Sequence, residues 1–397
     1  TMSDESMEGP MRVIDADQHL FEPRSMWRDF IDPGVREDAL AIEDDELGYP
    51  WLTWRGKRLY LAELQTPGQA KPIGRMRQRL KNGLPAEHSY DEGLSPEYYD
   101  AGARLGVLDR FKLESAVMLP NFGLLWEDML SSDIGALTAN MRAFNRWMAA
   151  AVEQSQGRLH GVAHVSLRDE RWVREELRSL ERAGIKLAMV GPAPVDGRAL
   201  SHPGLDPIWS VFEEHDVAAI FHVGGHAKPL HPAWYEQDPE PVDKVLDSAM
   251  LWVAPAVALG AMCVYGTFER HPRLRVGVIE MTAHWVPETL LMLEGALGFY
   301  VARHGEPPVP LPLTPSEYFR RHVRVGVLAY EQPERLIGLA GEDIYMFGSD
   351  WPHAEGLDDP VTVTLPLVEG LTDSGKQKLF AGNIDWLLGG VDISAAE

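Results

Sequence analysis

Short apolar runs alternate with longer helical patterns along nearly the whole chain, and this alternation most limits how the chain can fold. Eight of the runs are rich in Val, Ile, Leu and Ala and lack strict polar alternation, which is typical of strands buried on both faces of a parallel sheet. The predicted strands are Met11–Asp17, Glu114–Leu119, Leu159–Val165, Ile185–Val190, Val217–His222, Leu274–Ile279, His322–Val327 and Ile344–Ser349.

The segments between these runs have the spacing of amphipathic helices, with apolar residues at every third or fourth position. The predicted helices are Asp133–Gln156, Glu170–Ala183, Leu205–His215, Val242–Glu269, Trp285–Tyr300, Pro333–Leu339 and Ser374–Leu388. Strands joined by helical crossovers predict an α/β fold, a (β/α)8 TIM-type barrel. An open doubly wound sheet is the alternative that the pattern does not exclude.

We expect residues 1–397 to form a single barrel domain, because α/β barrels accept long insertions within one folding unit. Residues 24–105 are predicted to be an insertion or cap within it, since they make the connection after the first strand unusually long. Such a connection usually folds over the site or over a neighbouring subunit. Within the insertion, Pro50–Leu61 is predicted to form a small hairpin.

The composition excludes several classes of protein. The single cysteine, Cys263, rules out an intramolecular disulfide framework and a cysteine-based zinc site. The acidic N-terminus does not resemble a signal peptide, and the apolar stretch Ala249–Met262 is too short and too interrupted to span a bilayer, so we expect a cytoplasmic protein. The formal net charge of −23 argues against nucleic acid or an anionic membrane as partner and leaves a small-molecule substrate.

Three predicted strands end in residues that bind metals. Asp17 and His19 form a D-x-H pair after the first strand, His222 ends the fifth, and Asp350 follows the eighth. Alternate residues of an extended chain point the same way, so Asp17 and His19 can face one metal ion. Each feature alone has another explanation. Asp17 and His19 could be a solvated carboxylate beside a loop histidine, His222 a core histidine, and Asp350 a helix N-cap. Together they predict a metal site, because a barrel brings the strand ends to one face.

Longer motifs around these residues carry a family resemblance. The matching residues are Asp15, Asp17, His19, Glu22 and Pro23 in a D-x-D-x-H-x-x-E-P motif, the fifth-strand His222, Ser349, Asp350, Pro352, His353, Glu355 and Gly356 in an S-D-x-P-H-x-E-G motif, and Lys376, Lys378 and Asn383. By these motifs the chain resembles the amidohydrolase superfamily, specifically the amidohydrolase-related family that includes aminocarboxymuconate semialdehyde decarboxylase.

The resemblance implies a mononuclear metal centre with Asp17, His19, His222 and Asp350 as ligands. It implies one divalent ion as cofactor, Zn²⁺ or Mn²⁺, since two carboxylates among the ligands make the site harder and more anionic. Asp17 stands where many relatives have histidine, so its assignment depends most on the resemblance.

The sixth predicted strand departs from the family pattern. Decarboxylases of the family have a histidine at its end, whereas here Glu280 follows the strand and His284 comes four residues later. If Glu280 begins the next helix, His284 lies one turn along the same face. Glu280 is then the general base or the partner that orients His284, and Asp350 is the third predicted catalytic residue. A helix N-terminal charge at Glu280 and a surface histidine at His284 are the alternative.

Five further residues are predicted to bind substrate. His226 and His353 follow ligand positions, Asn121 and Trp126 follow the second strand, and Arg75 belongs to a basic stretch of the insertion. Arg75 is predicted to bind a substrate carboxylate across the subunit interface of a homo-oligomer, a dimer or tetramer. A solvated basic surface is the alternative for that stretch.

These features favour a metal-dependent hydrolase that acts on a small organic acid, amide or lactone-like substrate through a metal-activated water. The absence of the sixth-strand histidine is the reason for preferring hydrolysis. The alternative is a metal-dependent non-oxidative decarboxylase of an aromatic or unsaturated carboxylic acid. A non-catalytic metal- or ligand-binding barrel is the third interpretation.

Overall fold

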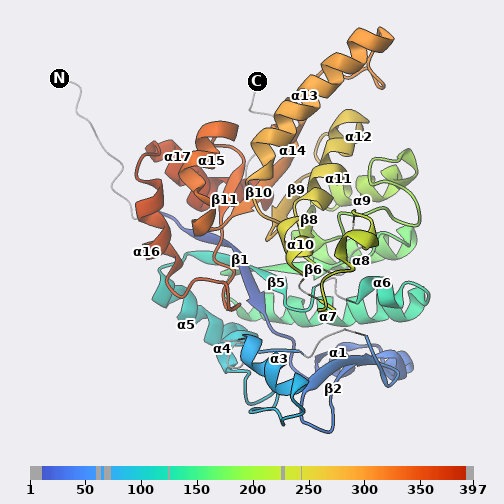
Figure 1. The fold of residues 1–397 in the computed structure, drawn as a ribbon, viewed down its shortest axis with the longest axis vertical. Helices are drawn as coiled ribbons and strands as arrows, with labels where there is room; N and C mark the ends of the chain where they lie inside the picture. The colour runs from blue at the N-terminus through green and yellow to red at the C-terminus, as the bar shows by residue number, and fades with distance from the viewer. Residues whose placement is uncertain are drawn as a thin grey trace, which may run out of the picture.

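Eight parallel strands form a barrel at the centre of the molecule (Figure 1). The computed structural model describes residues 11–59, 64–66, 73–123, 126–224, 229–242 and 244–389. In hydrogen-bonded order the strands are β1 (Ile14–Leu20), β5 (Ser115–Pro120), β6 (Leu159–His164), β7 (Leu187–Met189), β8 (Ala218–His222), β9 (Val276–Ile279), β10 (Val323–Val327) and β11 (Tyr345–Phe347). A parallel bridge between Gln18 and Trp351 joins the last strand's loop to the first strand. The predicted (β/α)8 barrel is therefore confirmed.

Helices surround this barrel, and each parallel strand is followed by helical segments that return the chain to the other end. They are α5 (Ala101–Phe111), α6 (Glu127–Leu130), α7 (Ile134–Gln154), α8 (Glu170–Arg182), α9 (Asp206–Glu214), α10 (Val245–Ala249), α11 (Val253–Val264), α12 (Thr267–Arg270), α13 (Trp285–His304), α14 (Pro315–His322), α15 (Pro333–Ala340), α16 (Pro360–Thr364), α17 (Asp373–Gln377), a π-helical turn (Lys378–Gly382) and α18 (Asn383–Leu387). Side-chain caps start the crossover helices α7 and α8: Asp133 accepts a hydrogen bond from Ala136 N–H and Asp169 from Trp172 N–H.

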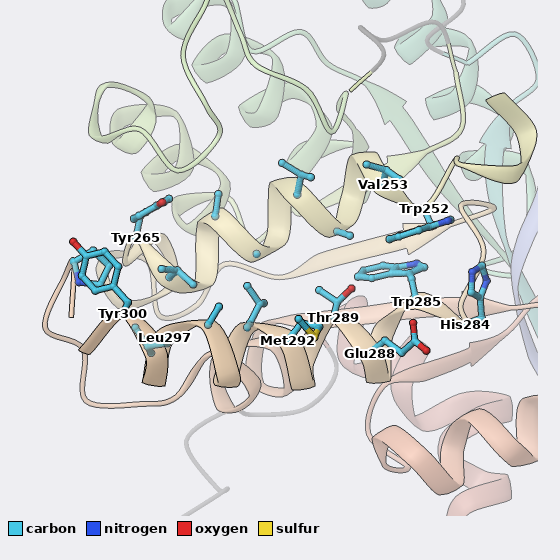
Figure 2. A pocket seen from close by; sticks show the side chains of 18 residues that line it. Trp252, Val253, Tyr265, His284, Trp285, Glu288, Thr289, Met292, Leu297 and Tyr300 are labelled. Carbon is cyan, nitrogen blue, oxygen red and sulfur yellow. The ribbon is translucent and has the colours of Figure 1, made fainter. Parts of the chain in front are cut away.

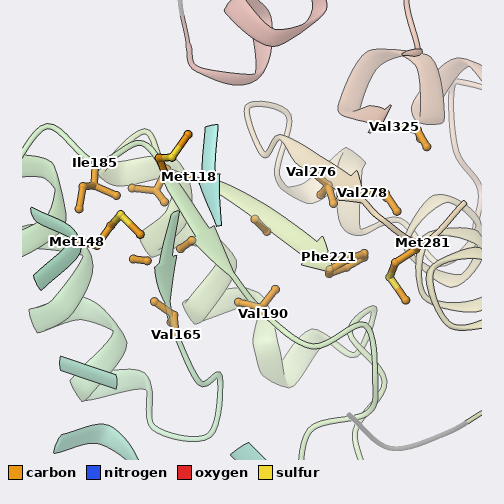
Figure 3. Close-up of a cluster of buried hydrophobic side chains, with 14 of the residues drawn as sticks. Met118, Met148, Val165, Ile185, Val190, Phe221, Val276, Val278, Met281 and Val325 are labelled. Carbon is orange, nitrogen blue, oxygen red and sulfur yellow. The ribbon is translucent and has the colours of Figure 1, made fainter. Parts of the chain in front are cut away.

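The core consists of an inner and an outer layer because strand side chains alternate between the two. Val117 and Leu119 of β5 belong to the cluster inside the barrel, whereas Ala116 and Met118 pack outward against helices. Figure 3 shows part of the outer layer, where Val276 and Val278 of β9 lie in the same cluster as Phe221.

One strand glycine leaves space for the inner layer. A Cβ at Gly277 would lie 2.8 Å from Ile220 Cδ1 and 3.0 Å from Leu387 Cδ2. The residue must therefore lack a side chain so that β8 and α18 can pack against β9.

The connection between β1 and α5 contains an antiparallel sheet of β2 (Leu40–Asp44), β3 (Pro50–Trp54) and β4 (Lys57–Arg58), with the short helices α1 (Met26–Phe30), α3 (Ile73–Lys81) and α4 (Pro96–Tyr99). The predicted hairpin is present as β3 and β4, and Leu61 lies outside the described residues. Asn140 of α7 holds the insertion in place: its Oδ1 accepts from Leu40 N–H at 2.8 Å, and its Nδ2 donates to Asp38 O at 2.8 Å.

Candidate metal centre

Four of the barrel strands contribute acidic or imidazole side chains to one place. Asp17 and His19 lie on β1, His222 is the last residue of β8, Glu280 directly follows β9, and Asp350 comes three residues after β11. The side chain of Glu280 is 18% exposed, and those of the other four are at most 4% exposed. The four residues predicted to be ligands therefore lie together, with Glu280 beside them.

The Nε2 atom of His19 lies in the middle of this cluster. It is 3.4 Å from Asp17 Oδ1, 3.3 Å from Asp350 Oδ1 and 3.4 Å from Glu280 Oε2. Glu280 Oε2 is also 3.0 Å from His222 Nε2. The ligand atoms of Asp17, His19, His222 and Glu280 all lie within 4.8 Å of one another, which is the spacing of side chains around a single ion.

In their neutral form, both histidines present an unprotonated nitrogen to the cluster. His19 Nδ1 donates to Pro120 O at 3.1 Å, and His222 Nδ1 donates to Val223 O at 2.8 Å. A carbonyl oxygen only accepts, so the proton of each neutral ring is on Nδ1 and the lone pair of Nε2 faces inward. Orientation of a ligand histidine by a backbone carbonyl is the usual arrangement at protein metal sites.

Five inward-facing atoms in the described residues are buried and have no hydrogen-bond partner: Asp17 Oδ1, His19 Nε2, His222 Nε2, Glu280 Oε2 and Asp350 Oδ2. Each buried atom left in this way costs roughly 1–3 kcal/mol, so five together require an explanation. A divalent cation accepts lone pairs from carboxylate and imidazole alike, so an ion held among these side chains would satisfy atoms of this kind. The residues present therefore fit a bound metal ion.

The electrostatics of the cluster favour a positive charge at its centre. Burial lowers the pKa of His19, but Asp17, Asp350 and Glu280 outweigh it and raise that pKa well above its usual value. Burial raises the pKa of Asp17 to about 6, with a further contribution from Asp350. Burial also acts to raise the pKa of Glu280, yet His19 and His222 hold it well below its usual value. The field that holds a proton on His19 also attracts a cation.

The backbone at the strand ends is arranged so that the carboxylates point inward. Asp350 (φ 56°) and Glu280 (φ 54°) adopt left-handed conformations, which are unfavourable for residues with a Cβ. Asp350 N–H donates to Asp17 O at 2.8 Å and His19 N–H donates to Trp351 O at 2.9 Å. These bonds compensate the strain and join the β11 loop to β1 at the site.

His353 connects two residues predicted for different roles. Its Nδ1 is 2.7 Å from Asp350 Oδ1 and its Nε2 is 2.9 Å from Asn121 Oδ1. Its ring lies on that of His19, with centroids 4.0 Å apart. Burial and His19 lower the pKa of His353, but Asp350 and Glu280 outweigh them and raise it. His353 and Asn121 therefore border the metal cluster and fix the orientation of Asp350.

Sequence reasoning assigned no role to the buried residues that support β1. Asp15 accepts hydrogen bonds from Asp17 N–H at 3.0 Å, Ser349 N–H at 3.0 Å and Gln18 Nε2 at 2.9 Å. Arg104 of α5 donates to Gln18 Oε1 at 3.2 Å and to the main-chain oxygen of His19 at 2.7 Å. The D-x-D motif is a signal for Asp15, but no local signal marks Arg104, which lies 85 residues from His19.

The other predicted site residues lie elsewhere. Trp126 is buried against His164, with ring centroids 4.8 Å apart. The Arg75 side chain is 60% exposed on α3 of the insertion and pairs with Glu87. His226 lies outside the described residues. His284 is exposed beside Trp252. It belongs to neither of the two metal-binding clusters of the described residues, which are Asp17, His19, His222 and Glu280 and, overlapping with it, His19, Glu280, Asp350 and His353.

The condition under which His284 would follow Glu280 by one helical turn is not met, because α13 begins at Trp285 and not at Glu280. Glu280 and Thr282 (φ 58°) both adopt left-handed conformations, which interrupt a helix. His284 is the residue before the helix, so it does not lie one helical turn beyond Glu280.

Comparison of the sequence with known protein families agrees with these motifs and strand ends. The sequence pattern of a family described as amidohydrolase matches residues 14–389 of this chain. The chain belongs to the amidohydrolase family.

Solved structures with the same fold include several amidohydrolase-type barrels. An amidohydrolase from Mycobacterium avium subsp. paratuberculosis K-10 shares 26% identity with this amidohydrolase, with 97% of this chain and 100% of that chain covered and a TM-score of 0.77. A 5-carboxyvanillate decarboxylase from Novosphingobium aromaticivorans, complexed with manganese and 4-hydroxy-3-methoxy-5-nitrobenzoic acid, shares 18% identity, with 96% and 97% covered and a TM-score of 0.65.

A dihydroxybenzoic acid decarboxylase from Polaromonas sp. JS666, with bound manganese and the inhibitor 2-nitroresorcinol, shares 14% identity over 98% of this chain and 100% of that chain, with a TM-score of 0.61. Among curated proteins, no match was found. At these identities the two decarboxylases show the fold that this amidohydrolase shares with them.

Proposed function

We propose that this amidohydrolase is a divalent-metal-dependent, non-oxidative decarboxylase of a hydroxylated aromatic carboxylic acid. The observation that carries the metal dependence is the set of five buried atoms without a hydrogen-bond partner, which belong to Asp17, His19, His222, Glu280 and Asp350 at one end of the barrel. The choice of reaction is supported by the decarboxylases of the same whole-chain architecture, which were crystallised with manganese and nitrophenol ligands. This proposal differs from the hydrolase that the sequence favoured.

Asp17, His19, His222 and Asp350 would hold the ion, with Glu280 as a fifth neighbour. Three carboxylates and two imidazoles form an oxygen-rich, anionic set, which suits Mn²⁺ better than Zn²⁺. When bound, the ion would supply Lewis-acid chemistry that attracts the carboxylate and hydroxyl oxygens of the substrate.

The protein's own contribution is a proton held next to that position. His353 shares a proton with Asp350 across a 2.7 Å contact, and Asn121 fixes the other side of the imidazole ring. Transfer of this proton to the carbon of the substrate's aromatic ring that carries the carboxylate interrupts the aromaticity of that ring. The bond between that carbon and the carboxylate then breaks, its electron pair restores the aromatic ring, and CO₂ leaves. The step balances without an oxidant.

Hydrolysis is the second candidate, and one observation favours it. Glu280 occupies the end of β9, where the decarboxylases that the sequence resembles have a histidine. A carboxylate there is a base within 3.0 Å of His222 Nε2, which is the type of group that removes a proton from an attacking water.

The two reactions are distinguished by their products. The Mn²⁺-loaded enzyme is incubated in ¹⁸O-labelled water with hydroxybenzoates such as 2,6-dihydroxybenzoate and 5-carboxyvanillate, and with amides and lactones of similar size. Release of CO₂ with no label in the aromatic product supports decarboxylation. Label in a newly formed carboxylate without CO₂ would show hydrolysis and reject the proposal. Asp350→Asn, which keeps the shape of the side chain, serves as the inactive control in both assays.

A further inference from the structure

Helix α13 is longer than the surface that packs against it. Its fully buried residues, Trp285, Val286 and Leu290, all lie within its first six positions. The remainder extends beyond the barrel (Figure 1). A helical segment with little buried surface gains little stability from tertiary packing, so an apolar surface on this part requires a cover.

The projecting part carries a ridge and a groove side by side. The ridge consists of Leu291, Met292 and Phe299, which are 71, 67 and 69% exposed. The groove, of about 860 Å³, lies between α11 and α13. Figure 2 shows Trp252, Trp285 and His284 at one end of the groove and Tyr265 and Tyr300 at the other.

Charge is scarce on this surface, although the chain has a net charge of −23. From Thr289 to Val301 the only charged residue of α13 is Glu294. Its Oε1 accepts a hydrogen bond from Ser316 N–H at 3.0 Å, so it is directed to the neighbouring helix α14. Depletion of charge around exposed aromatic and aliphatic side chains is the composition of the centre of a protein interface.

We propose that this face binds the same face of a second copy of the chain in a two-fold symmetric dimer. Leu291 and Phe299 stand four residues to either side of Gly295 on one stripe of the helix. Two antiparallel α13 helices that cross at Gly295 therefore set Leu291 against Phe299 of the partner subunit, and the reverse contact follows by symmetry. The space next to Gly295 is open, with no atom within 4 Å of a Cβ built there, so the helices approach closely at the crossing.

The exposed area matches what a dimer needs. Val257, Tyr265 and Tyr300, which are 61, 50 and 39% exposed, border the groove beside the ridge residues. With roughly 150–250 Å² for a large side chain, the six residues present on the order of 600 Å² of apolar surface. That is most of the ~800 Å² that each partner of a stable interface buries.

A lipid surface is the main rival occupant. Val245–Val264 has the length and composition of a membrane-crossing helix, with a mean hydropathy of 1.6, although such segments are also common as core helices. The structure divides this segment into α10 and α11, and α11 packs against α14 and α13. A continuous span is therefore absent from these residues, and the second copy explains the symmetric arrangement of the ridge better.

The first experiment measures the mass of the metal-loaded protein in solution by sedimentation and light scattering at micromolar concentration. We expect a dimer for the wild type and a monomer for the double variant Leu291→Glu/Phe299→Glu, with unchanged circular dichroism and metal content. Leu84→Glu, at a residue 44% exposed in the insertion, is the matched control and should remain dimeric. A monomeric wild type, or a double variant with the wild-type mass, would overturn the proposal. Binding of the monomeric wild type to phosphatidylcholine vesicles would favour the lipid occupant.

The second experiment tests the crossing point. The native Cys263 is buried, so a cysteine introduced at Gly295 is the accessible thiol. Under mild oxidation Gly295→Cys should form a disulfide-linked dimer, because the two-fold axis brings the two thiols together. Gly106→Cys, at an open helical glycine of α5, should remain monomeric on a non-reducing gel. Equal cross-linking of both variants, or none at Gly295, contradicts the antiparallel arrangement.

Discussion

Asp350 is the residue at which most interactions of the site meet. Its main-chain N–H holds β1, one carboxylate oxygen lies near both His19 and His353, and the other carboxylate oxygen has no hydrogen-bond partner among the described residues. The ligand role of His222 and the positioning role of His353 and Asn121 can be tested by separate substitutions, because these residues contact different atoms of the site.

Removal of a ligand should release the metal. We expect His222→Gln to lower metal affinity by roughly a hundredfold or more, since Nε2 of His222 is one of the unpaired inward-facing atoms. The matched control is His164→Gln, because His164 is also a buried strand-end histidine but belongs to neither metal-binding cluster of the described residues. Elemental analysis of both purified variants measures the effect. Metal retained by His222→Gln at the wild-type level would contradict the ligand assignment.

His353 and Asn121 should affect turnover without affecting metal content. Asn121→Leu removes the oxygen 2.9 Å from His353 Nε2, so the imidazole loses one of the two contacts that orient it. We expect kcat to fall roughly 10–100-fold, as for other residues that orient active groups, with about one metal ion per chain still present. Asn121→Asp keeps an acceptor and should recover most of the activity. An equal loss in both variants would indicate a structural role only.

At the scale of elements, the sequence predicted the barrel strands well and their ends less well. A parallel strand buried on both faces has a local signature, and all eight predicted runs contain strands. β1 nevertheless continues to Leu20, three residues beyond the prediction, because its last three residues pair with β5 and Gln18 and His19 also pair with Trp351 from the other end of the chain. Such a pairing has no local signal.

The helix predicted at Val242–Glu269 shows a related limit. The structure contains α10, α11 and α12, separated at Met250–Trp252 and at Gly266, whose φ is 81°. The largely apolar composition of this region from Ala249 onward satisfies a helical pattern at many positions and hides these breaks. The left-handed conformation of Glu280 was equally unpredictable, since residues with a Cβ rarely adopt it and no local signal marks it.

The loop after β11 yields a prediction for that element. A Cβ at Gly356 would lie 2.2 Å from Asp350 O, so Gly356→Ala must displace the segment that holds the Asp350 carboxylate. We expect a loss of roughly 1–3 kcal/mol in the free energy of unfolding, together with a lower metal content. Gly338→Ala is the control, because Gly338 lies in α15 with no atom within 4 Å and should gain roughly 0.5–1 kcal/mol. Thermal melts and elemental analysis decide, and unchanged behaviour of Gly356→Ala would contradict the tight approach.

At the scale of the whole molecule, the contacts that join distant segments could not be predicted. Arg104 holds the end of β1 through a hydrogen bond to His19, 85 residues away in the sequence. Asn140 holds the insertion through a hydrogen bond to Leu40, 100 residues away. A single sequence shows the polar residue but not its partner. The protonation of a buried histidine is equally hard to predict, because it depends on which elements enclose the side chain. It can be measured through the pH dependence of the free energy of unfolding.

His322 should make the folded state less stable in acid. It is buried at the end of α14, its Nδ1 donates to Leu274 O at 2.7 Å, and its ring stacks on Phe268. Burial lowers its pKa from 6.5 to about 4. Between these pH values the unfolded chain binds a proton that the folded chain does not, so stability is lost as the pH falls from about 6.5 to 4, by about 3 kcal/mol in total.

The variant His322→Asn, which keeps a donor for Leu274 O, should therefore show a smaller loss of stability over this pH range than the wild type. His271 provides the opposite control. Burial lowers its pKa, but Glu213 and Asp206 outweigh burial and raise it, so its contribution is present at low pH and is lost as the pH rises through the raised value. His271→Asn should consequently steepen the loss in acid. Urea unfolding at several pH values, with metal removed from all three proteins, measures the slopes, and parallel slopes for His322→Asn and wild type would refute the assignment.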